Sequence, residues 1–293
     1  MKPLTHCLAA TDLSASGNLA MARAMQLTQA LGIPLDVLHV LPQTLVQQVQ
    51  RWLIGHDPAL LERLDQQCHE ELSALAERFA EQETPAPGIL VRQGEPSEVI
   101  SREVDARGSD LLVVGAHGSG HLHEAMIGST PISLLGQVNC PLLIVRQMAR
   151  TPYRRALIAV DFSPRSAKLL QLAEQIAPQA ERILLHALDL PFSGRLQMAG
   201  VAKSELQGLQ DKAEEQAKEQ FHALTAGLEG QAQRCVIRHG DPSLCILDYT
   251  KQHDCDLILL AQQPRHKLSE LLLGSTTRHV VYQSQQDVLI LRQ

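Results

Sequence analysis

Glycines and a serine in one short stretch could together hold an anion. An apolar run over residues 111–114 leads into Gly115-Ala-His-Gly118, and after nine further residues Gly128-Ser129 opens a helix-like segment. Glycine lets the backbone turn sharply and approach a bound group closely. The first N–H groups of a helix lie at the positive end of its dipole and attract phosphate. The stretch therefore predicts an anion-binding loop, and we interpret the anion as the phosphate chain of an adenine nucleotide.

A carboxylate at the end of a strand could add to this site. The run Cys-Leu-Ala-Ala-Thr ends in Asp12, and Ser14 follows as the expected N-cap of a helix. Asp12 is either a ligand for the sugar or base of a nucleotide, or a helix-entry residue that helps Ser14 to cap. Asp161 stands in the same setting in the second half of the chain and fits either interpretation.

Histidines inside the loop also allow more than one interpretation. His117, His121 and His123 lie there together with Glu124. They could bind a metal, contact phosphate or face solvent. The spacing of these histidines is not the i, i+4 spacing of a helical metal site, and no cysteine accompanies them. The pattern therefore favours solvent-facing residues, with phosphate contact as the next alternative.

The elements that must position these residues alternate regularly. The expected strands cover residues 6–12, 35–40, 89–92, 111–115 and 141–145, and the expected helices cover 14–31, 57–79, 96–107 and 129–138. This alternation predicts a doubly wound parallel α/β sheet, which binds ligands beyond the carboxyl ends of its strands. Asp12, Val40 and Gly115 all stand at such ends.

The same plan begins again at Arg154. The repeated segments, first copy before second, are 94–97 and 240–243, 110–114 and 256–260, 128–129 and 274–275, and 142–146 and 288–292. One residue before the end of the second strand, both copies carry a histidine, His39 or His186, which we interpret as a core histidine with a satisfied hydrogen bond. Such sustained similarity predicts a duplicated domain, with domains at 1–146 and 154–293.

Composition limits the classes of function. The 293 residues have a formal net charge of -6 and a pI of about 6.1, which argues against nucleic acid or a membrane surface as a partner. Six cysteines never form C-x-x-C, and most of them stand in apolar runs, as reduced core residues do. No signal peptide or membrane-spanning run is evident, so a cytoplasmic protein is expected.

On these motifs the sequence closely resembles the universal stress protein family, as a tandem two-domain member. The glycine spacing, the strand-terminal Asp12, the Gly-x-Pro turn at 94–96 and the final Cys-Pro-Leu-Leu-Ile-Val strand occur in the order of that family, and the resemblance covers essentially the whole chain. It implies an adenine-nucleotide α-hydrolase-like fold, with five parallel strands ordered 3-2-1-4-5 in each domain. It also implies ATP, with or without Mg²⁺, as the ligand of the nucleotide-binding members.

Carried over by residue, the resemblance implies a site in the first domain. Phosphate would be lined by Gly115, Gly118, Gly128 and Ser129, the ribose or base would meet Asp12, and the adenine would meet the backbone of Val40.

The second copy departs from the pattern, because Ala261 and Pro264 replace the two leading glycines. Proline lacks an N–H and alanine resists positive φ. We therefore expect a full nucleotide site only in the first domain. Asp161, Gly274 and Ser275 would be remnants or parts of a weaker site. The Arg265-His266-Lys267 run could hold an anion without glycines, but such a cluster is more typical of a solvated loop.

Catalysis has little support, since neither a Gly-x-x-x-x-Gly-Lys-Ser/Thr motif nor a Gly-x-Ser-x-Gly elbow is present. The leading hypothesis is a nucleotide-binding stress protein that senses or stores the ATP state and has an unknown protein partner. The alternatives are a nucleotide-independent interaction module and a slow ATPase. The two halves are expected to pack as an internal pseudo-dimer through their final strands, and a further homodimer stays open.

Overall fold

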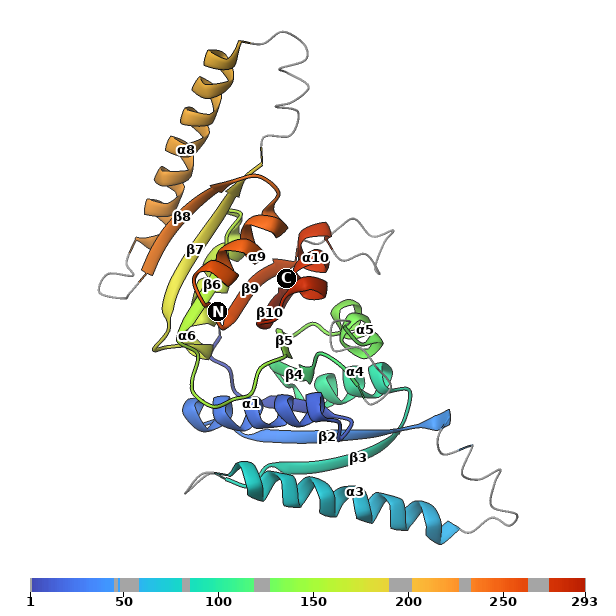
Figure 1. The fold of residues 1–293 in the computed structure, drawn as a ribbon. Coiled ribbons are helices and arrows are strands. Elements are labelled where there is room, and N and C mark those ends of the chain that lie inside the picture. Colours follow the sequence, from blue (N-terminus) through green and yellow to red (C-terminus); the bar gives the residue numbers. More distant parts are fainter. Residues whose placement is uncertain are drawn as a thin grey trace. The chain divides into compact units, whose positions relative to one another are not determined.

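The structure is a computed structural model that describes residues 2–44, 47, 58–80, 85–118, 127–189, 202–226, 233–262 and 274–292. Its first half runs through five strands and four helices (Figure 1): β1 (Cys7–Thr11), α1 (Ala15–Leu31), β2 (Leu35–Pro42), α3 (Pro58–Phe79), β3 (Gly88–Gly94), α4 (Pro96–Arg107), β4 (Leu111–Gly115), α5 (Ser129–Gln137) and β5 (Leu142–Val145).

The second half repeats this order: β6 (Arg155–Ala159), α6 (Pro164–Ile176), β7 (Glu181–Leu188), α8 (Lys203–Thr225), β8 (Gln233–His239), α9 (Pro242–Gln252), β9 (Leu257–Gln262), α10 (Ser275–Gln283) and β10 (Asp287–Arg292). Among the described helices, none combines the length and the apolar character needed to cross a membrane.

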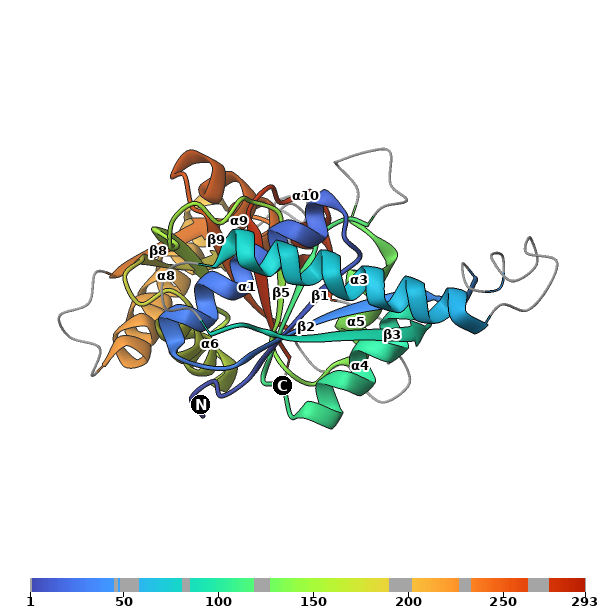
Figure 2. The ribbon, with the colours of Figure 1, turned by 90° about the horizontal axis from the view of Figure 1, so that it is seen from below.

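The first-half strands form a parallel sheet in the order β3-β2-β1-β4-β5, as predicted. Helices α1 and α3 lie on one side of these strands, and α4, which packs against α5, lies on the other (Figure 2). The sheet is therefore doubly wound. Strands β2 and β3 continue beyond the hydrophobic pattern because they pair with each other as far as Pro42 and Gly94.

The final strands of the two copies pair with each other. Strand β10 lies antiparallel to β5, with Val288 opposite Ile144 and Leu289 opposite Leu143. Contacts between residues divide the chain into two compact units, and β10 belongs to the unit that holds the first-half strands. The predicted pairing of the final strands is confirmed.

The other compact unit holds β6 to β9. Its strands pair in the order β9-β6-β7-β8, which matches β4-β1-β2-β3 of the first half. The duplication predicted from the sequence is thus visible in strand order as well as in sequence.

Local chemistry explains where the first-half helices begin and end. Ser14 caps α1, since its Oγ accepts the N–H of Gly17 at 3.1 Å, and Gly32 ends the helix in the left-handed region. Pro96 begins α4 at the position that needs no N–H, after Gly94 has turned the chain with a φ of 144°. These residues therefore begin and end the helices as the sequence predicts.

Candidate functional site

A cavity of about 660 Å³ lies at the carboxyl ends of the first-half strands. All six residues predicted for the first domain line it: Asp12, Val40, Gly115, Gly118, Gly128 and Ser129. The structure brings them together because β1, β2 and β4 are neighbours in the sheet and end at the same edge. The volume is in the range of small-molecule and cofactor sites.

One side of this cavity is apolar. Strand β2 contributes Leu38, Val40 and Pro42, and α4 contributes Pro96 and Ile100. Val40 is 7% exposed and Ile100 4%, so both are fixed parts of the core. Such a wall suits the faces of a planar, weakly polar group.

The start of α5 forms another part of the wall and is suited to an anion. Gly128 is the N-cap, and no side chain caps the helix there. The cavity is lined by Gly128, Ser129 and Thr130 in turn. The N–H of Gly128 itself donates to the carbonyl of Ala116 at 2.8 Å, which joins the helix start to the end of β4. The first N–H groups of α5 are therefore held at the cavity, where they can donate to an anion.

The packing of the chain requires glycine at position 115, but the reason differs from the one that the sequence predicts. The glycines with positive φ in the described residues are Gly32, Gly94, Gly108 and Gly240, so a left-handed turn is not what the loop glycines provide. A Cβ at Gly115 would lie 2.6 Å from the carbonyl oxygen of Ser16. The expectation that alanine fails here because of positive φ is wrong. It fails because the end of β4 packs directly on the start of α1.

His117 and Asp12 tie the loop to this same region. The N–H of His117 donates to Ser16 Oγ at 3.1 Å. Asp12 accepts the N–H of Ser14 on Oδ1 at 3.1 Å, and a Cβ at Gly118 would lie 3.0 Å from its Oδ2. The carboxylate thus serves the helix entry and also lies against the glycine loop. Its role as a ligand for the sugar or base of a nucleotide stays a prediction.

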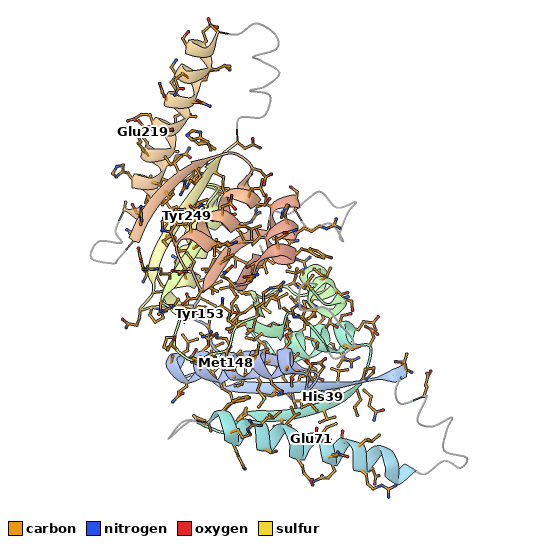
Figure 3. All side chains as sticks on the ribbon, in the orientation of Figure 1. His39, Glu71, Met148, Tyr153, Glu219 and Tyr249 are labelled. Carbon is orange, nitrogen blue, oxygen red and sulfur yellow. The ribbon has the colours of Figure 1, made fainter. Side chains whose placement is uncertain are left out.

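His39 is both a core histidine and part of the cavity wall. Its ring projects from β2 (Figure 3), is 7% exposed, and has Nδ1 2.9 Å from the carbonyl oxygen of Thr11. The predicted satisfied histidine is confirmed. Its place on the wall is not among the sequence predictions, and neither are those of Thr11, Leu13 and Ile100. The signal that could have placed His39 on the wall is its position next to Val40 at a strand end.

The second half keeps parts of this arrangement. Asp161 Oδ1 accepts the N–H of Ser163 at 3.0 Å and the hydroxyl of Ser166 at 3.1 Å. Gly274 is the N-cap of α10, and Ser275 is its first residue. Several residues weighed in the sequence lie outside the described residues: Pro264, the 265–267 run, His121, His123 and Glu124.

Known proteins resemble this chain in both of its halves. The sequence model of the Universal stress protein family matches residues 3–146 and 152–292. A universal stress protein of Mycolicibacterium smegmatis is 23% identical over 304 residues, covering 97% of this chain and 96% of that protein. Universal stress protein A homolog 2 of Coxiella burnetii is 28% identical over 145 residues, covering 48% of this chain and 95% of that protein.

Solved structures show the same fold. The crystal structure of a universal stress protein from Archaeoglobus fulgidus superposes with a TM-score of 0.68 at 18% identity and covers 98% of each chain. The tandem arrangement of this fold is therefore shared with a protein of known structure.

Proposed function

Because the chain belongs to the universal stress protein family, we propose that its first half binds one adenine nucleotide, ATP, and that the protein senses or regulates through the bound state. The observation that carries the proposal is the cavity of about 660 Å³ in which all six predicted residues meet. Nucleotide binding occurs in the family, since one universal stress protein has been solved in complex with cAMP. The proposal for this chain depends on its own cavity.

The features of the cavity suit the two ends of a nucleotide. The end of β2, where His39 and Val40 line the cavity, would take the base, and the start of α5 at Gly128 and Ser129 would take the phosphates. A Cβ at Gly128 would make ordinary contacts at 3.5 Å or more with the protein. A glycine there is thus not needed by the protein's own packing, which favours a role in leaving room for a ligand.

A magnesium ion would enter with the nucleotide. Mg²⁺ in nucleotide sites is held by one or two carboxylates together with phosphate oxygens and water. Asp12 is the carboxylate among the residues lining the described part of the cavity, and it would be the protein's contribution. Its position against Gly118 places it beside the loop that we propose for the phosphates.

We assign the site to binding and not to catalysis. In the described part of the cavity wall, the charged side chains comprise Asp12 alone, apart from the titratable His39 and His117. A phosphoryl-transfer site places cations and a water-orienting group around the transferred phosphate. Any hydrolysis of ATP by the bound metal and loop would be slow and incidental to holding the nucleotide.

Binding can be tested with a matched pair of variants. Gly128→Ala places a methyl group at the N-cap of α5, and Gly274→Ala places one at the N-cap of α10, where a Cβ would meet nothing within 4 Å. Calorimetric titration with Mg²⁺-ATP should give one site per chain in the wild type. Gly128→Ala should weaken it by about tenfold or more, because its methyl group would take up room left for the phosphates, and Gly274→Ala should leave it unchanged.

Two results would contradict nucleotide binding in the first half. A wild-type protein that yields no adenine nucleotide on extraction and shows no saturable ATP binding would refute the proposal. Equal weakening by the two variants would refute a nucleotide site confined to the first half. Gly115→Ala is unsuitable for this purpose, because its Cβ would collide with Ser16 whatever the ligand.

A protein partner and a cytoplasmic location complete the proposal. The six cysteines are all free thiols, four of them buried, which is usual in a reducing compartment. Pull-down with and without ATP, followed by repetition with Gly128→Ala, would show whether a partner reads the bound state.

A further inference from the structure

The residue after the strand-terminal aspartate has the same uncommon backbone in both halves but a different side chain. Leu13 has a φ of 64° and Phe162 has a φ of 59°. Few residues other than glycine, asparagine and aspartate adopt this left-handed region, and they keep it only where the surroundings fix it. The two loops therefore share a conformation at this point, and their side chains can be compared directly.

In the second half the aromatic side chain at this position covers the histidine of β7. The centroid of the Phe162 ring lies 4.4 Å from that of the His186 ring. The rings of Phe162 and Phe221 form a T-shaped pair with their centroids 5.0 Å apart. His186 is itself held by a contact of 2.9 Å between Nδ1 and the carbonyl oxygen of Val160. A planar ring of the chain thus lies against this imidazole.

In the first half the equivalent histidine is held in the same way but lines the cavity. His39 has Nδ1 at 2.9 Å from the carbonyl oxygen of Thr11, and both His39 and Leu13 belong to the cavity wall. Among the residues that the structure describes, no aromatic ring packs on His39 in the way that Phe162 packs on His186. The branched, non-planar Leu13 stands where the second half has the ring.

The two halves also differ at the position three residues after the N-cap of the following helix. Ser166 uses its hydroxyl to bind the carboxylate of Asp161, whereas the corresponding residue of α1 is Gly17, which lines the cavity. A Cβ at Gly17 would lie 2.5 Å from Thr11 Oγ1 and 2.8 Å from Asp12 Oδ1, so this turn of α1 packs closely on the end of β1 and its aspartate. The second half instead engages its aspartate with a hydroxyl of its own helix.

We propose that Phe162 occupies, in the second half, the space that the planar base of the nucleotide takes in the first half. On this view the residue after the strand-terminal aspartate decides which half binds, and the second half is closed by its own side chain. The base lies against His39. Because a carbonyl only accepts, Nδ1 of His39 carries the proton in the neutral ring, and Nε2 is left as an acceptor for an N–H or O–H of the ligand.

This inference rests on the proposed nucleotide site, and Leu13→Phe tests it. The second half shows that phenylalanine fits this backbone conformation. The matched control is Leu244→Phe, the same exchange at a position of α9 that is 52% exposed. In Mg²⁺-ATP titrations Leu13→Phe should bind about tenfold more weakly than the wild type or worse, because the added ring overfills the site. Leu244→Phe should bind as the wild type does.

The outcomes separate the two proposals. If the wild type binds no adenine nucleotide, the proposed function itself fails. If the wild type binds one ATP and Leu13→Phe, with an unchanged circular dichroism spectrum, binds it equally well, only the present inference fails.

If Leu13→Phe does not fold, a titration of the wild type followed by NMR tests where the base lies. Imidazole nitrogen and carbon-bound proton resonances of His39 and His186 can be identified from their loss in His39→Gln and His186→Gln. Saturation with Mg²⁺-ATP should shift the His39 resonances and leave those of His186 in place. Unmoved His39 resonances at saturation, or a shift at His186 of equal size, would overturn the inference.

Discussion

Replacing Asp287 by alanine should destabilise the protein more than any exchange at its surface. The carboxylate is 0% exposed at the start of β10, and Arg23 of α1, 3% exposed, has its Nε 3.3 Å from Oδ2. Oδ1 accepts the N–H groups of Arg146 and Gln147 at 2.8 and 3.0 Å, just beyond β5. One carboxylate therefore joins the helix of the first repeat, the chain after β5 and the last strand of the second repeat.

The size of the effect follows from what the exchange leaves behind. Asp287→Ala keeps the Arg23 guanidinium buried, with its hydrogen bonds to Gln26 and Thr151 but without this anion. Removing one partner of a buried ion pair costs about 3–5 kcal/mol of unfolding free energy. Arg23→Leu with Asp287→Leu should recover most of this loss, because Leu172, at the position of Arg23 in the second repeat, is fully buried without a charge.

Urea denaturation followed by circular dichroism would measure these differences in the wild type, Asp287→Ala and the double variant, and the single variants Arg23→Leu and Asp287→Leu would give the coupling. A loss below about 1 kcal/mol in Asp287→Ala would refute the reasoning, since a value of that size is typical of exposed ion pairs. A double variant no more stable than Asp287→Ala would show that the backbone N–H groups of Arg146 and Gln147, and not the arginine, need the carboxylate.

Two further predictions concern packing and thiol reactivity. Gly115→Ala should lower the unfolding free energy by about 1–3 kcal/mol, because its Cβ would lie 2.6 Å from the Ser16 carbonyl, and the same denaturation assay measures it. A thiol reagent at pH 8 should modify Cys235 and Cys245 in the native protein and reach Cys7, Cys68, Cys140 and Cys255 only on unfolding, since burial raises the pKa of Cys140 and of Cys255 to about 12. Peptide mass mapping would identify the modified residues, and rapid labelling of Cys140 would contradict the expectation.

The fold could be predicted from the sequence because the signals for its helices and strands are local and occur in both halves of the chain. Ser14, Gly32 and Pro96 each mark a helix end by their own chemistry, and each half of the chain repeats the order of elements. The right-handed crossovers of parallel strands then leave few arrangements of five such strands. The carboxyl-edge position of Asp12, Val40 and the loop follows from that arrangement, which is why the candidate site residues met in one cavity.

The remaining features depend on contacts that no local pattern specifies. The pair of Arg23 and Asp287 joins residues near opposite ends of the chain, and a charged residue in a helix gives no sign of a distant partner. The sequence predicts the correct position for Gly115 but the wrong reason, because its close neighbour is the backbone of Ser16. The left-handed backbone of Leu13 has no sequence signal either, since leucine is not a residue that this region selects.

The duplicated chain separates what the fold requires from what a ligand would require. Features present in both halves, such as the histidine held through Nδ1 by the preceding strand and the left-handed residue after the aspartate, are needed to build either half. A feature found in one half only needs its own explanation. At Gly115 and Gly17 that explanation is packing, because a Cβ would lie 2.6 Å from the Ser16 carbonyl oxygen and 2.5 Å from Thr11 Oγ1. Leu13 differs from both, since the same left-handed backbone carries Phe162 in the second half and so accepts either side chain. Leu13 lines the cavity together with His39, and that space is where a ligand of the first half must be sought.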